Sequence, residues 1–234
     1  MILKQLQDLI GDIYDVRITH DVYDFLVTDR RHLPASARSR GSDEELIVAQ
    51  PVAGTDAGEV GMSLYLDAAL LERLRQADPM ESLHDGNVAD CWTALEGVSH
   101  FLYVAWNAGH DKPVSLLELE MQAEVDKYVA SYWLLRRQFP DRFPAELLSI
   151  LFERTRIDPS LSSGRADLYR HASRYAQRFC RRLEQTFRGA HARAFRGARD
   201  DGERGGAART ILAELRRFYR LTNARKLAHI ERTA

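Results

Sequence analysis

Residues 90–109, DCWTALEGVSHFLYVAWNAG, decide the fold that this sequence predicts. Large apolar side chains recur on most sides of the segment: Trp92, Leu95, Val98, Phe101, Leu102 and Trp106. A helix that is apolar nearly all round has to be buried. We therefore expect a helix over about 88–108 at the centre of a helical bundle.

Helical periodicity continues from this segment almost to the end of the chain. Apolar residues at helical spacing predict further helices over about 115–138, 144–154, 165–195 and 207–231. Gly and Pro punctuate the boundaries between them. The stretch GARDDGERGG at 197–206 has almost no apolar residues, which predicts a flexible linker.

The N-terminal part has a different pattern. Leucines and isoleucines at helical spacing predict a helix over 2–13, and alternating apolar residues predict strands near 14–18 and 23–27. The runs ELIVAQPV and EVGMSLYLD flank a Gly/Asp-rich turn, as in a β-hairpin. Asp67 stands where a carboxylate caps the first amides of a helix over 68–77.

These patterns predict an α+β fold that is predominantly α. A small N-terminal antiparallel sheet, in residues 1–86, precedes a four- or five-helix bundle in residues 87–234.

The charge is strongly polarised along the chain. Residues 1–134 contain 10 Lys and Arg against 23 Asp and Glu, whereas residues 135–234 contain 23 against 11, so the two parts carry −13 and +12. Such an asymmetry concerns partners, because a basic surface attracts acidic macromolecules. We expect nucleic acid, an acidic protein, or the acidic half of another copy in a homo-oligomer.

Arginines at helical spacing form the candidate binding residues of the basic part. They are Arg170, Arg174, Arg178 and Arg181 in the predicted helix 165–195, and Arg216, Arg217 and Arg220 in the last one. Their planar guanidinium groups suit phosphates and carboxylates. Tyr169 or Tyr219, if exposed, would add an aromatic surface beside them.

A polar stripe crosses the apolar helix 88–108. Glu96 and His100 lie on it, and Glu120 and Glu124 share one face of the next helix. A buried polar group without a partner costs about 1–3 kcal/mol, so these residues face water, pair with each other, or hold a ligand. A structural network is one interpretation. The other is a divalent metal, although di-iron bundles use Glu-x-x-His pairs and Glu96 and His100 are spaced i, i+4.

Familiar enzyme signatures do not occur. The sequence has no Gly-rich phosphate loop, no Gly-x-Ser-x-Gly elbow, no Cys-x-x-Cys pair and no apolar run of membrane length. We expect a cytoplasmic, non-enzymatic interaction or regulatory protein without a cofactor, whose basic C-terminal helices bind an acidic partner. The alternative is a metal-dependent helical-bundle enzyme that uses Glu96, His100, Glu120 and Glu124.

Overall fold

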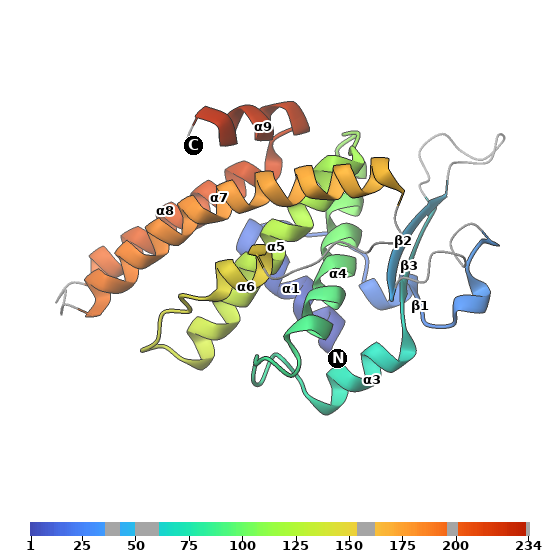
Figure 1. Ribbon diagram of the computed structural model, residues 1–234, viewed down its shortest axis with the longest axis horizontal. Helices are drawn as coiled ribbons and strands as arrows, with labels where there is room; N and C mark the ends of the chain where they lie inside the picture. The colour runs from blue at the N-terminus through green and yellow to red at the C-terminus, as the bar shows by residue number, and fades with distance from the viewer. Residues whose placement is uncertain (36–42, 50–60, 154–161, 196–200, 233–234) are drawn as a thin grey trace. The chain divides into compact units, whose positions relative to one another are not determined.

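The computed structural model describes residues 1–35, 43–49, 61–153, 162–195 and 201–232. Over these residues the protein is mostly helical, as Figure 1 shows, and carries a small mixed sheet of three strands. The chain divides into two compact units, one of residues 1–11 and 16–113, the other of residues 12–15 and 114–234. None of the helices in the described ranges is long and apolar enough to cross a membrane.

The first helix, α1 (Ile2–Tyr14), confirms the predicted helix over 2–13. The strand expected near 14–18 was wrong, because Tyr14 ends the helix and residues 16–18 form no strand. Asp15 adopts a left-handed conformation with φ 54°, and the Val16 amide then donates to the Gly11 carbonyl (3.0 Å). Tyr14 and Val16 are both buried at this helix end, and this explains why apolar residues alternate here although no strand forms.

Three strands form the sheet in the order β1-β3-β2. They are β1 (Leu26–Val27), which follows the 3-10 helix η1 (Val22–Phe25), then β2 (Glu44–Ala49) and β3 (Gly61–Leu66). The predicted hairpin is confirmed, since β2 and β3 pair antiparallel from Glu44↔Leu66 to Ala49↔Gly61; its turn lies outside the described residues. The expectation of a wholly antiparallel sheet was wrong, because β1 pairs parallel with β3.

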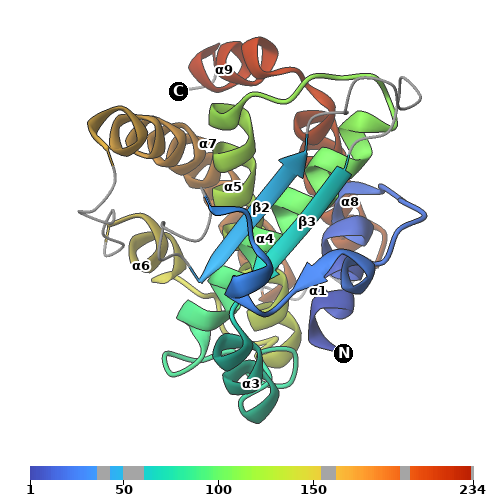
Figure 2. The same cartoon turned by 90° about the vertical axis from the view of Figure 1, so that its right-hand side faces the viewer.

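Two helices follow the sheet in the first unit. In α3 (Ala68–Gln76), the Asp67 carboxylate accepts from the Ala69 amide (2.8 Å), as the sequence predicted. The apolar helix α4 (Val88–Ala108) has the predicted bounds and packs across β2 and β3, behind the sheet in Figure 2. The structure therefore groups α4 with the sheet in the first unit. The domain boundary at residue 86 stays a prediction.

The second unit is helical. It contains α5 (Leu116–Gln138), α6 (Leu147–Glu153), α7 (Ser163–Phe195), α8 (Asp201–Arg220) and α9 (Asn223–Arg232). The Ser115 hydroxyl caps α5 by accepting from the Glu118 amide (3.2 Å). The helix expected over 207–231 is in fact two, separated at Leu221 and Thr222. Helix α8 already begins inside the predicted linker 197–206, of which residues 197–200 lie outside the described residues.

Aromatic stacking and one ionic cluster join the last three helices. Helices α7 and α8 run side by side in Figure 1, and the rings of Phe179 and Phe218 stack between them at 3.9 Å. The Glu214 carboxylate of α8 accepts from Arg182 of α7 (2.8 Å) and lies 2.6 Å from Nε2 of His229 in α9. One half-buried carboxylate thus links all three helices.

A close approach at Gly97 sets the packing of α4 on the sheet. A Cβ atom added there would lie 2.9 Å from Cδ1 of Leu64 and 3.0 Å from Cγ of Glu44. Leu64 is fully buried, so its side chain has little room to move.

Gly97→Ala should therefore lower the free energy of unfolding by about 1–3 kcal/mol, because overpacking outweighs the helix propensity of alanine. Gly164→Ala is the matched control, since no heavy atom lies within 4 Å of its added Cβ. Denaturant unfolding of both variants measures the difference. An equal or stabilising effect at Gly97 would contradict the tight packing.

Candidate functional site

An exposed basic face runs along α7. The side chains of Arg170, Arg174, Arg178 and Arg181 are exposed there, at spacings of four, four and three residues. The opposite side of the helix is buried and consists of Ala172, Ala176, Phe179, Cys180, Leu183 and Phe187. Because the apolar stripe packs into the core of the unit, the arginines necessarily point to solvent. We call these four arginines the α7 basic face.

Acidic neighbours leave most of this face available. Arg170 forms an ion pair with Asp167, and Arg181 lies 3.5 Å from Glu153, but both side chains of each pair are more than half exposed. Exposed ion pairs contribute little and exchange readily with other partners. For Arg174 and Arg178, the described residues offer no ion-pair partner.

The arginines of α8 lie in different surroundings. Arg216 donates to the backbone carbonyl of Ile13 (3.3 Å), and Arg220 donates to those of Tyr14 (3.0 Å) and Asp15 (2.9 Å). These carbonyls belong to the last turn of α1 and to the residue that follows it, where a helix leaves acceptors unsatisfied. Two of the three predicted binding residues in α8 therefore have backbone acceptors within the unit, although Arg220 is exposed, as Arg217 is.

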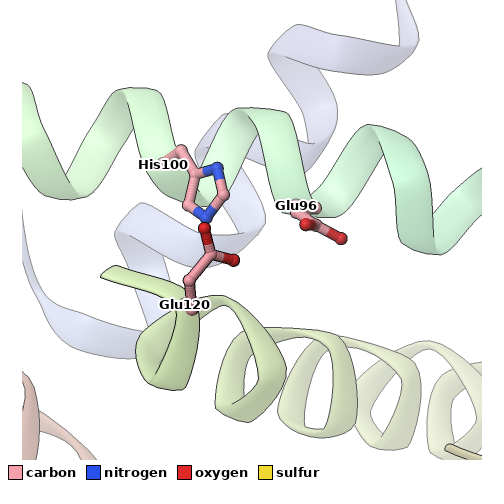
Figure 3. Close-up of side chains that lie close together, drawn as sticks. All are labelled: Glu96, His100 and Glu120. Atoms are coloured by element: carbon pink, nitrogen blue, oxygen red, sulfur yellow. The ribbon is translucent and has the colours of Figure 1, made fainter. Parts of the chain in front are cut away.

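The predicted metal ligands divide between the two units. Figure 3 shows Glu96 and His100 leaving α4 on the same side, while the third labelled residue, Glu120, belongs to α5 of the second unit. Within the first unit, Nδ1 of His100 lies 3.3 Å from the carboxylate of Glu44 in β2. Within the second unit, Glu124 accepts from Lys127, three residues along α5 (2.8 Å). The metal centre stays a prediction.

Sequence reasoning missed a chain of buried polar groups in the second unit. The Tyr14 hydroxyl donates to Asp126 (2.5 Å), and the side-chain amide of Gln122 donates to the same carboxylate oxygen (2.7 Å). Lys226 of α9 completes the chain by donating to the Gln122 carbonyl oxygen (2.5 Å). Gln122 and Lys226 are fully buried, and Asp126 is 1% exposed.

Aromatic rings enclose the lysine of this chain. The Lys226 ammonium lies 4.9 Å from the ring centre of Phe218 and 5.9 Å from that of Tyr219, at cation–π distances. Tyr219 would add an aromatic surface only if it were exposed, but it is fully buried and stacks on Tyr14 at 4.3 Å. Lys226 looked like one of many basic residues in its helix, and only its position beside Ile230 and His229 on the buried side of α9 could have distinguished it.

Burial changes the ionisation of the groups around Asp126. Desolvation lowers the pKa of Lys226 from 10.5 to about 7, although the charges of Glu118 and Asp126 act in the opposite direction. Desolvation also raises the pKa of Tyr14 well above 10, and the neighbouring Asp126 raises it further. The phenol therefore stays a hydrogen-bond donor to the carboxylate at any ordinary pH.

A pH dependence of stability follows from Lys226. Between pH 7 and 10.5 the unfolded chain keeps the lysine proton while the folded protein releases it, so the free energy of unfolding rises with pH in that window. Compared with Lys226→Met, the wild type should gain stability from pH 7 to 9 with a slope of at most about 1.4 kcal/mol per pH unit.

Denaturant unfolding at several pH values measures this slope. The buried tyrosines and Cys180 are common to both proteins, so the difference between them isolates Lys226. The control Lys4→Met, at a solvent-accessible lysine, should keep the slope of the wild type. Parallel pH profiles for wild type and Lys226→Met would contradict the buried, partly neutral amine.

Comparisons with other proteins identify neither a family nor a function for this chain. No known protein family matches the chain, and the searches of curated proteins and of solved structures found no match either. A function for this protein therefore has to follow from its own residues and their surroundings.

Proposed function

We propose that this is a non-enzymatic interaction or regulatory protein of the cytoplasm that binds an acidic macromolecule through the α7 basic face. The observation that carries the proposal is the exposure of Arg170, Arg174, Arg178 and Arg181 on one side of a single helix. The net charge of +12 over residues 135–234 supports it, because a basic field attracts acidic partners and speeds their encounter.

The arrangement suits an extended anionic partner. At 1.5 Å of rise per residue, the face covers about 16 Å of the α7 axis from Arg170 to Arg181. Each guanidinium offers a planar fork that can donate two hydrogen bonds to one phosphate or carboxylate. Arg174 and Arg178 lie in the middle of the row and are the arginines most available to a partner. Arg170 and Arg181, at the two ends of the row, have Asp167 and Glu153 as neighbours.

Charge reversal tests whether this face, rather than net charge, binds polyanions. The double variant Arg174→Glu/Arg178→Glu should elute from a heparin column at clearly lower salt than the wild type, because two attractive contacts become repulsive. The control Arg225→Glu/Arg232→Glu changes the net charge equally at two exposed arginines of α9 and should elute near the wild type. Equal losses for both variants, or no retention of the wild type, would remove the proposal.

A metal-dependent enzyme is the second candidate function. The observation that favours it is the Glu44 carboxylate beside Nδ1 of His100, because a metal-bound histidine usually donates its other ring N–H to such a group. Glu96, one turn away on α4, would be a further oxygen ligand. Glu120 and Glu124 complete the predicted set.

Elemental analysis distinguishes this candidate from a structural network. Protein purified after growth with iron, manganese and zinc should contain about one metal ion per chain, and His100→Ala should lose it. Metal at less than about a tenth of an equivalent in the wild type would leave Glu96 and His100 with a structural role.

A further inference from the structure

The α7 basic face lacks the apolar groups on which protein interfaces depend. Among the described residues, the exposed large hydrophobic side chains are Met1, Val48, Leu116 and Phe139. None of them lies on α7, α8 or α9. Protein partners gain most of their binding energy from a few buried aromatic or aliphatic anchors at the centre of the contact. A surface that presents only guanidinium groups and polar neighbours fits a partner whose own surface is a row of charges.

The same face also lacks a platform for unpaired bases. Proteins that bind single-stranded nucleic acid stack successive bases on aromatic side chains, at about 1–3 kcal/mol per base. Phe179 and Phe187 of α7 are buried in the core instead. Phe179 stacks on Phe218, and Phe187 stacks on Tyr132 at 3.8 Å. Tyr169 and Tyr175 are half-buried, so neither ring is fully open for a base to stack on it.

A duplex backbone needs neither of these features. Its phosphates provide one charge per about 1.7 Å of axis, and they are bound by arginines without reading the bases. The row of α7 extends from the basic face to Arg188, which is exposed on the same side of the helix. From Arg170 to Arg188 it measures about 27 Å, which is about three quarters of one turn of duplex.

We propose that the α7 basic face binds the phosphate backbone of double-stranded nucleic acid without sequence preference. This inference rests on the proposed function and names its partner. Four contacts at Arg170, Arg174, Arg178 and Arg181 would give the non-specific affinity of a backbone binder, in the micromolar range at physiological salt.

Fluorescence anisotropy with labelled probes tests the inference. The probes are two duplex DNAs of about 20 base pairs with unrelated sequences, one of their single strands, and poly-glutamate. With about four phosphate contacts, affinity for either duplex should fall roughly 100-fold from 50 to 200 mM salt. In Arg174→Gln/Arg178→Gln, which keeps two contacts, the same change of salt should weaken binding only about 10-fold. The control Arg225→Gln/Arg232→Gln should keep the wild-type salt dependence, and circular dichroism verifies that both variants are folded.

The outcomes separate this inference from the proposed function. Equal affinity for the two duplexes, with the salt dependence reduced only in the α7 variant, supports it. Tighter binding of the single strand, or a preference above about tenfold for one duplex sequence, overturns backbone binding to duplexes. Binding of poly-glutamate but not of duplex overturns the inference and leaves the proposed function standing with an acidic protein, or a second copy of the chain, as partner. Failure to bind any of the probes removes both.

Discussion

The buried amino group of Lys226 determines how the polar side chains inside the second unit are arranged. Lys226 is fully buried, and taking the partners from a buried charge costs about 3–5 kcal/mol, so the unit has to supply acceptors and negative charge around it. The Gln122 carbonyl oxygen accepts a hydrogen bond from Lys226, and Asp126 accepts hydrogen bonds from the Gln122 amide and the Tyr14 hydroxyl. The positions of α5, α9 and the end of α1 within this unit are therefore set by one chain of hydrogen bonds, around which the aromatic residues pack.

Arginines of the same unit have two roles, and their neighbours decide which. Arg216 and Arg220 are directed at backbone carbonyls of residues 12–15 and act as a cap for α1. Among the described residues, the arginines of the α7 basic face have no backbone acceptor of this kind, and the buried side of α7 consists of apolar residues such as Phe179, Leu183 and Phe187. Composition alone makes all of these residues alike. Only the structure distinguishes the arginines that donate to backbone carbonyls of α1 from those of the α7 basic face.

The sequence predicted what depends on local periodicity and missed what depends on distant partners. Helix α4 and the exposed row on α7 follow from spacing within one segment, and so did the hairpin of β2 and β3. The parallel pairing of β1 was hidden, because a two-residue strand obtains its partner from a segment almost 40 residues away. The roles of Arg216, Arg220 and Lys226 were hidden for the same reason, since their acceptors lie at least 100 residues away. Tyr14 and Val16 alternate like a strand because a helix end and a cap happen to bury them both.

The short segment Asp12–Asp15 determines which fragment of the chain could fold as the second unit. It belongs to the second unit although almost the whole first unit separates it from Val114 in the chain. A fragment that starts at Val114 would contain every helix from α5 onward, yet it would leave Asp126 without the Tyr14 phenol and two arginines without the carbonyls they cap. The second unit is thus discontinuous in sequence. A fragment that reproduces it must also contain residues 12–15, for example by joining them through a linker to one end of residues 114–234.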